Sequence, residues 1–386
     1  MKVCWQQRWE TAWREIALEG KGGWYGPLTR AILRLASWPY GWAIEARNRL
    51  YDRHWLKIHT AAVPVISIGN LHLGGTGKTP CIEYVARYFR QWDIRVAILS
   101  RGYGTDSGRN DEAYVLEENL PDVPHLQNAD RVAAAECAVQ ELDSQLLLLD
   151  DGFQHRRLHR DLDIVLINAA RLPGDDLLFP RGSLREPFRS LRRADCVILT
   201  HTDQVDPSEL CHWQLRLSDW ATGKVVAHAV HEPVALRCGT QVRQPQELNG
   251  QPVAAFCGIG QPDNFKRTLK RLGAHVCDFR SYPDHHPYTK AEVETLHRWA
   301  SKFPVDTWIV TTQKDQVKLQ LNLLGDRPLW TLTVAFAVTQ GKDAFHAVLD
   351  GIRATIPTVT SDREPQPAQV QENCQAQVQM VNARCN

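Results

Sequence analysis

The chain has 386 residues and a formal net charge of +1, from 45 basic and 44 acidic residues. With 43% apolar and 23% charged residues, it is an ordinary globular chain, which excludes wholesale disorder, a fibrous repeat and a polycation that coats nucleic acid. Its length predicts two to three domains. None of the ten cysteines forms a CxxC pair, so we expect reduced thiols, neither a disulfide framework nor a zinc site. We also expect no signal peptide and no membrane-spanning helix.

Tryptophan and arginine are concentrated near the N-terminus. Seven of the 13 tryptophans lie in the first 55 residues. Trp5, Trp9 and Trp13 have the spacing of one helix face, and a second amphipathic stretch runs from Leu28 to Trp42 between arginines. Tryptophan favours the membrane interface and arginine suits anionic headgroups. Residues 1–60 are therefore predicted to form a helical segment that lies in a membrane interface, kinked or split at Pro39 and Gly41. The alternative is an amphipathic helix packed on its own domain.

The rest of the chain alternates strand-like and helix-like runs. Nearly continuous apolar strands alternating with amphipathic helices are typical of an α/β fold with a mainly parallel sheet. The predicted strands are 63–68, 96–99, 146–149, 164–167, 197–200, 253–256, 276–279, 308–311 and 329–334, and the predicted helices are 78–92, 262–272, 290–302 and 342–356. The predicted domains are a core over 61–225, a two-stranded β linker over 226–250, a smaller α/β lobe over 251–360 and a disordered tail over 361–386.

The turn after the first predicted strand carries the strongest chemical signal. The run from His72 to Thr79 reads HLGGTGKT between a β run and a helix, which is the setting of a P-loop. The glycines allow backbone N–H groups to surround phosphate oxygens, Lys78 reaches the β- and γ-phosphates, and the Thr79 hydroxyl suits Mg²⁺. The strict pattern has glycine where His72 stands, so the match fails at one position.

A second signal follows four leucines at 146–149. Asp150 and Asp151 come directly after this buried strand, as in a Walker B segment whose aspartate holds Mg²⁺. Gln154 and His155 follow at once.

Taken together, the motifs resemble the tetraacyldisaccharide 4'-kinase family of lipid A biosynthesis. They cover residues 27 to 355 and occur in this order: 69–71, 74–80, 99–104, 111–112, 150–155, 180–187, 256–260, 284–286 and 311–315. The resemblance implies transfer of the ATP γ-phosphoryl group to the 4'-hydroxyl of a tetraacylated disaccharide 1-phosphate. It also implies a peripheral, monotopic enzyme on the cytoplasmic face of the bacterial inner membrane, with no nucleic acid and no obligate protein partner.

The resemblance also implies roles for individual residues. Asp111 is expected to be the catalytic base, with His285 as its partner, and Lys78 the phosphate-binding lysine. His286 remains an alternative to His285. Because Asp111 and His285 fall in different predicted lobes, the pair is expected to assemble only when the lobes meet. The nucleotide site is expected to contain His72, Leu73, Gly74, Gly75, Thr76, Gly77, Lys78, Thr79, Gln154, His155, Arg181 and Arg185, and the magnesium site Thr79, Glu112, Asp150, Asp151 and Glu186.

Two other classes of protein remain open. One is a P-loop switch ATPase of the partition or metal-insertion type, but these carry a second lysine where Leu73 stands. The other is a soluble small-molecule kinase, which has no use for an interfacial N-terminus.

Overall fold

The computed structural model describes residues 13, 16–17, 25–102, 111–170 and 177–357. The predictions for Trp5 and Trp9, for most of residues 1–22 and for the tail over 361–386 therefore lie outside the described residues. By its internal contacts the chain divides into two units. Unit 1 comprises residues 1–108, 120–230 and 337–386, and unit 2 comprises residues 109–119 and 231–336. The domain boundaries expected from the sequence stay a prediction.

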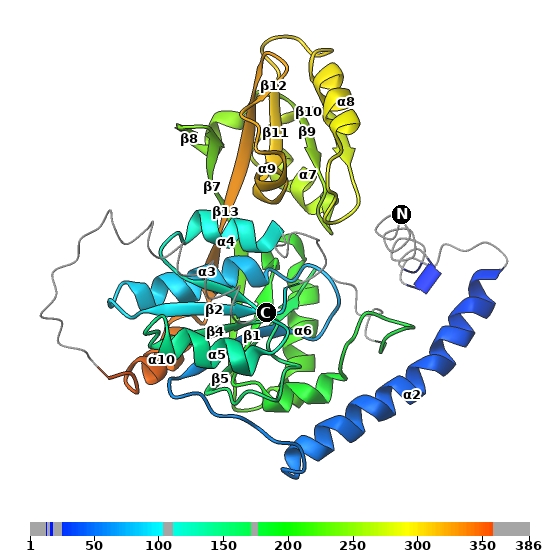
Figure 1. The fold of residues 1–386 in the computed structure, drawn as a ribbon. Helices are drawn as coiled ribbons and strands as arrows, with labels where there is room; N and C mark the ends of the chain where they lie inside the picture. The colour runs from blue at the N-terminus through cyan, green and yellow to red at the C-terminus, as the bar shows by residue number, and fades with distance from the viewer. Residues whose placement is uncertain (1–12, 14–15, 18–24, 103–110, 171–176, 358–386) are drawn as a thin grey trace, which may run out of the picture. The chain divides into compact units, whose positions relative to one another are not determined.

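The N-terminal helix α2 runs from Gly26 to Asp52 (Figure 1). Proline in its first turn suits a helix start, because the N–H that proline lacks has no partner there. Pro39 lies inside the helix, which continues past it and past Gly41, so the expected split is wrong, whereas the expected kink stays a prediction. Ser37 donates to the carbonyl oxygens of Leu33 (2.9 Å) and Leu178 (3.0 Å), so this part of α2 is also held by a distant segment. Within the described residues, no helix combines the length and hydropathy that crossing a bilayer requires.

Unit 1 is built on a parallel sheet in the order β7-β6-β5-β1-β4-β2-β3. Its strands are β1 Val65–Asn70, β2 Val96–Ser100, β3 His125–Gln127, β4 Leu146–Asp150, β5 Leu162–Asn168, β6 Cys196–Thr200 and β7 Val225–Cys238. Its further helices are α3 Lys78–Arg90, α5 Arg131–Gln140, α6 Pro207–Trp220 and α10 Lys342–Arg353, with the 3₁₀ turn η3 Phe188–Arg193. The expected α/β fold with a mostly parallel sheet is confirmed.

Both faces of this sheet are covered, which explains the continuous apolar strands. Leu147 and Leu149 of β4 pack in one core cluster with α5, and the intervening Leu148 is equally buried. Helix α3 contacts β1, β2 and β4. Since successive side chains of a strand point to opposite faces, a sheet buried on both sides needs apolar residues at every position.

Unit 2 repeats the α/β design at a smaller size. Its strands are β8 Gln241–Arg243, β9 Pro252–Cys257, β10 His275–Ser281, β11 Trp308–Thr312, β12 Leu323–Leu324 and β13 Arg327–Gln340, and its helices are α4 Asp111–Asn119, α7 Pro262–Arg271, α8 Lys290–Ala300 and α9 Gln313–Leu319. Alternate residues of β9 divide between two core clusters. Ala255 packs with Phe265 of α7, and Phe256 packs with Leu296 of α8, so each face of the sheet has its own helix.

Two long strands, β7 and β13, have residues in both units. Within the predicted linker, β7 pairs antiparallel with the short β8, as Leu236 does with Arg243. Helix α4 lies between two parts of unit 1 in the sequence, but belongs to unit 2 because it packs against α9.

Candidate functional site

The loop between β1 and α3 has the backbone of an anion-binding turn. Gly74 and Gly77 adopt positive φ angles of 97° and 86°, which residues with a Cβ rarely accept. Gly77 is the N-cap of α3, so Lys78 and Thr79 form the first turn of that helix. The N–H groups at a helix N-terminus lack partners within the helix and attract phosphate.

Polar contacts hold this loop in shape. The Asn70 side chain donates to the Thr76 hydroxyl at 2.8 Å, and the Thr200 hydroxyl donates to the Thr76 carbonyl oxygen at 2.9 Å. His72 is buried, against the ring of Phe188. It stands where the strict P-loop pattern has glycine, so this site accepts the larger side chain by placing it in the core.

The two acids after β4 have different surroundings. Asp150 is the last residue of β4, opposite Ile68 of β1. Asp151 lies beyond the strand, where its carboxylate contacts Lys78 Nζ at 3.5 Å and Arg185 Nη1 at 2.6 Å. Burial acts to raise the pKa of Asp151, but Lys78 and Arg185 outweigh it and lower that pKa. Asp151 is therefore ionised and aligns both cations beside the loop.

Residues 177–186 form a strap along the loop. Leu73 N–H donates to the Ser183 carbonyl oxygen (2.8 Å), and Arg185 N–H donates to that of Leu71 (2.7 Å). The strap is also bound to α2, where the Tyr40 hydroxyl donates to the Arg185 carbonyl oxygen at 3.0 Å. The strap therefore connects α2 to the nucleotide loop and places the Arg185 guanidinium on Asp151.

The remaining predicted residues of unit 1 lie around this strap and loop. The Gln154 amide donates to the Asn70 carbonyl oxygen at 3.0 Å. Burial, together with nearby Arg131 and other arginines, lowers the pKa of His155 to about 4, so its ring is neutral. Glu186 is fully buried and accepts from Asn48 (2.8 Å) and Arg193 (3.0 Å).

Arg181 lies against a different part of the chain from Arg185. Its Nη1 donates to the Ala17 carbonyl oxygen at 2.7 Å, and its side chain lines a groove beside α2. Its expected role at the nucleotide phosphates stays a prediction.

The donors present suit magnesium. The Thr79 hydroxyl and the Asp150 carboxylate are hard oxygen ligands, and Mg²⁺ commonly binds one or two protein oxygens plus waters and phosphate oxygens. Across the described residues, no three His, Cys, Asp or Glu side chains form a metal cluster. Glu112 of unit 2 instead pairs with Lys314 Nζ at 2.7 Å.

Unit 2 contains the predicted acid–histidine pair. His285 Nδ1 lies 2.6 Å from Asp111 Oδ1, and Lys318 Nζ lies 3.6 Å from Asp111 Oδ2. The Asp111 side chain is buried because α4 packs on α9. Since both residues belong to unit 2, the expectation that the pair assembles only when the two lobes meet is wrong.

The neighbouring histidine has a separate environment. His286 Nε2 lies 3.0 Å from Glu292 Oε1, and its ring stacks on Tyr282. The geometry thus distinguishes the two histidines that the sequence left open, and it is His285 that contacts Asp111.

Charge around the pair favours an ionised acid. Burial acts to raise the pKa of Asp111, but the hydrogen bond from His285 and the charges of Lys314, His285 and Lys318 together hold that pKa well below its usual range. The same hydrogen bond raises the pKa of His285 against the effect of burial. Lys314 and Lys318 were not among the predicted site residues, although their i, i+4 spacing on one helix places both on one face.

We expect the titration of His285 to show this pairing. Its pKa should lie above about 6.5, the ordinary histidine value, and should fall in Asp111→Asn, which removes the negative charge. NMR titration of the ring protons measures both. Since the folded-state pKa is raised, the stabilisation is full below the ordinary value and declines as pH rises through the raised one. His286→Gln is the control, and an unshifted His285 in Asp111→Asn would contradict the pairing.

The strand β1 makes a close contact with the segment after β4. A Cβ on Gly69 would lie 2.6 Å from Phe153 Cβ and 2.8 Å from Phe153 N. Gly69→Ala should therefore lower the free energy of unfolding by roughly 1–3 kcal/mol, as overpacked cores do. Urea unfolding measures this loss. Gly75→Ala, where nothing lies within 4 Å of the added Cβ, should change stability much less, and equal losses would contradict the steric reason.

A strand, a glycine loop capping a helix that begins Lys-Thr, and an acid at the end of the neighbouring strand define a P-loop nucleotide-binding protein. The sequence matches the tetraacyldisaccharide-1-P 4'-kinase (LpxK) family over residues 29–353. The chain belongs to this family.

Individual relatives agree with this assignment. The chain is 39% identical to a tetraacyldisaccharide 4'-kinase of Anaeromyxobacter sp. strain K, over 92% of this chain and 96% of the relative. It is 36% identical to that of Aquifex aeolicus, over 76% and 91% of the two chains. Among solved structures, LpxK from Aquifex aeolicus in complex with ATP matches with a TM-score of 0.67 and 32% identity, over 84% of this chain and 99% of that one.

Proposed function

We propose that this chain transfers the γ-phosphoryl group of ATP to the 4'-hydroxyl of tetraacyldisaccharide 1-phosphate, a step of lipid A biosynthesis. Membership of the 4'-kinase family supports this reaction, and the likeness to a structure in complex with ATP supports the nucleotide. The observation that carries the proposal is the combination of a P-loop in unit 1 with a buried, ionised carboxylate bonded to histidine in unit 2. A switch ATPase does not need the carboxylate–histidine pair, because it has no acceptor hydroxyl to deprotonate.

Unit 1 supplies the binding and charge for phosphoryl transfer. The loop N–H groups and Lys78 would hold the β- and γ-phosphates, and Arg185 is kept beside Lys78 by Asp151. Thr79 and Asp150 would hold Mg²⁺, which neutralises phosphate charge when it is bound. Glu112, Asp151 and Glu186 as metal ligands stay predictions, since each already contacts a cation.

Unit 2 supplies the base. Asp111 would accept the proton of the 4'-hydroxyl, while His285 orients the carboxylate through the 2.6 Å contact. A carboxylate this acidic is a weak base. Phosphoryl transfer proceeds largely through a loose transition state, in which the nucleophile needs correct placement more than early proton removal, so the low pKa suits the task.

We also infer that α2 lies in the interface of the inner membrane, on its cytoplasmic side, where a lipid substrate is reached. A stripe of exposed apolar side chains supports this placement, and we call it the apolar stripe of α2. It consists of Leu28, Ile32, Leu35, Trp38 and Trp42. Their spacing places them along one side of the helix, and Trp42 is 74% exposed. The helix contacts the rest of unit 1 through Ser37, Tyr40 and Asn48, which leaves the stripe exposed.

The function is tested with purified protein, Mg-ATP and tetraacyldisaccharide 1-phosphate in neutral detergent, with the product read by mass. We expect one phosphate added, and ATP turnover that depends on the lipid. ATP turnover at the same rate without the lipid would favour a switch ATPase.

Membrane binding is tested separately by vesicle flotation. Trp38→Ser/Trp42→Ser should weaken it, whereas Val305→Ser, which changes a 96% exposed side chain of unit 2, should not. Unchanged flotation of the double variant would place the anchor elsewhere.

A further inference from the structure

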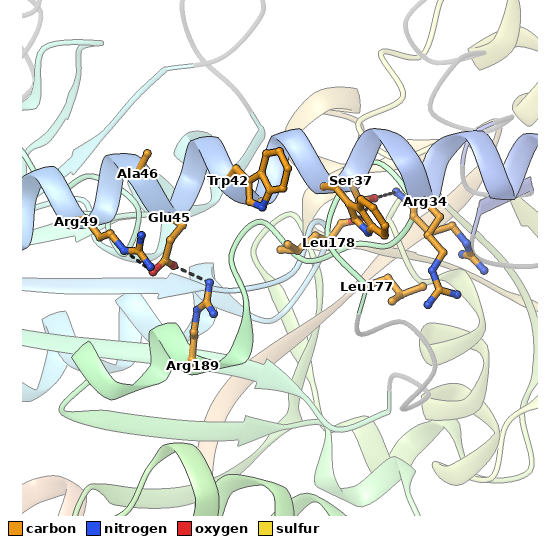
Figure 2. Close-up of a pocket in the computed structure, with 12 residues that line it drawn as sticks. Arg34, Ser37, Trp42, Glu45, Ala46, Arg49, Leu177, Leu178 and Arg189 are labelled. Atoms are coloured by element: carbon orange, nitrogen blue, oxygen red, sulfur yellow. Dashed lines mark hydrogen bonds and ion pairs between the residues drawn. The ribbon is translucent and has the colours of Figure 1, made fainter.

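A groove of about 760 Å³ lies between α2 and the segment 177–189 of unit 1. Figure 2 shows Trp42 and Arg34 on α2 and Leu177, Leu178 and Arg189 across from them. The volume is within the range of small-molecule sites. Lys78, Thr79, Asp150 and Asp151 do not line this groove, so it is distinct from the nucleotide loop.

The groove combines positive charge with apolar walls. Arg34, Arg49, Arg181 and Arg189 line it together with a single acid, Glu45. Glu45 contacts Arg49 at 3.1 Å and Arg189 at 2.7 Å. Because one carboxylate stands against four guanidinium groups, the lining carries a net positive charge. Guanidinium groups bind phosphate in a bidentate manner.

The apolar walls determine which phosphate compound fits. Trp38 and Trp42 belong both to the apolar stripe of α2 and to the groove lining, which Leu177 and Leu178 extend on the other element. A free phosphate or a nucleic acid would leave these surfaces in water, whereas the acyl chain of a lipid would cover them.

We propose that this groove binds one anionic phospholipid of the bilayer, with its headgroup phosphate at the arginines and part of an acyl chain between Trp38, Trp42 and Leu178. The inference rests on the proposed interfacial position of α2. It goes further, because it assigns a defined site of stated charge rather than a general affinity for membranes. The occupant is bulk phospholipid, since the groove is continuous with the stripe through which α2 would meet the bilayer.

The strap 177–186 forms one wall of the groove. It is hydrogen-bonded to the nucleotide loop through the N–H groups of Leu73 and Arg185. The lipid would therefore be bound against the segment that positions Arg185. The proposal does not require the lipid for the chemical step.

The test uses a short-chain phosphatidylglycerol below its micelle concentration, so that no membrane surface is present. We expect saturable binding of one molecule by calorimetry, much weaker binding of the phosphatidylcholine of the same chain length, and none of glycerophosphate, which lacks the chains. Equal binding of both lipids, or of glycerophosphate, would overturn the assignment of the groove to an anionic lipid.

Two kinds of variant locate the binding. Arg34→Gln should weaken binding about fivefold and Arg34→Gln/Arg49→Gln about 25-fold, from the usual contribution of one basic side chain to anionic-lipid binding. Arg30→Gln, a turn away on α2 and outside the groove lining, is the matched control and should change binding less than about twofold. Ala46→Phe keeps every charge but fills the groove, and should abolish binding. Equal effects of Arg30→Gln and Arg34→Gln, or full binding by Ala46→Phe, would overturn the proposal.

Kinase assays in neutral detergent separate this proposal from the proposed function. The Arg34→Gln/Arg49→Gln variant should keep the wild-type KM for tetraacyldisaccharide 1-phosphate. A raised KM for that lipid would assign the groove to the substrate and contradict the phospholipid. Absence of phosphorylation by the wild-type protein would contradict the proposed function alone, because calorimetric binding of phosphatidylglycerol is measured without ATP.

Discussion

Lys78→Ala should lower kcat by about 10²–10³, the usual loss when one preorganised charge at a developing anion is removed. Lys78 is the first residue of α3 and contacts Asp151 at 3.5 Å. In the free protein the lysine is thus aligned by an acid, and with ATP bound it would offset the charge of the transferring group. Steady-state kinetics at saturating Mg-ATP and lipid measure the loss.

Loss of folding has to be distinguished from loss of charge at the site. Asp151 also pairs with Arg185 at 2.6 Å, so its carboxylate retains a cation in Lys78→Ala, and we expect the variant to unfold close to the wild-type denaturant midpoint. The control is Arg87→Ala, which removes a cation from the same helix at an exposed position paired with Glu83; it should retain turnover. Near wild-type kcat in folded Lys78→Ala would refute the P-loop assignment.

Asp111→Ala should lower kcat by roughly 10²–10⁴, the range of general-base catalysis. The KM for ATP should change much less, because Asp111 lies in unit 2 and is proposed to act on the acceptor hydroxyl. Removing the carboxylate also takes away the 2.6 Å partner of His285 and leaves Lys318 in contact with Asp315. Asp111→Asn, which keeps the size but not the charge, separates packing from basicity.

A double-mutant cycle tests the pair. His285→Ala alone should lower kcat, and Asp111→Ala/His285→Ala should lose less than the product of the single losses, since residues that act as a unit are not additive. His286→Ala is the matched control, because that ring contacts Glu292 instead. If Asp111 were a magnesium ligand, raising Mg²⁺ would restore activity and the losses would multiply.

The local motifs and the class of fold were determined by the sequence itself. Continuous apolar strands indicated a sheet covered on both faces, and Leu147 and Leu148 of β4 are both buried. The glycines before Lys78 predicted a turn of positive φ that leads into a helix, as found at Gly74 and Gly77. These features depend on residues close together in the chain, so pattern and propensity suffice to predict them.

The surroundings of Asp111 and the histidine that it contacts were decided only by the tertiary structure. Asp111 was expected in the core lobe, yet it begins α4, which packs on the distant α9, and it contacts His285. The choice between His285 and His286 also depends on tertiary contacts, since His285 meets Asp111 and His286 meets Glu292, which sequence spacing does not show.

Contacts between segments that are distant in the sequence also explain the strap and the groove. The family resemblance placed Arg181 and Arg185 together at the nucleotide phosphates, whereas in the structure Arg181 contacts Ala17 and Arg185 contacts Asp151. The pairing of 177–186 with the loop at 71–73 joins segments that are distant in the sequence. Such contacts are selected by the packing of the whole chain, so the residue types that bind phosphate could be predicted from the sequence, whereas which of them meet at one site could not.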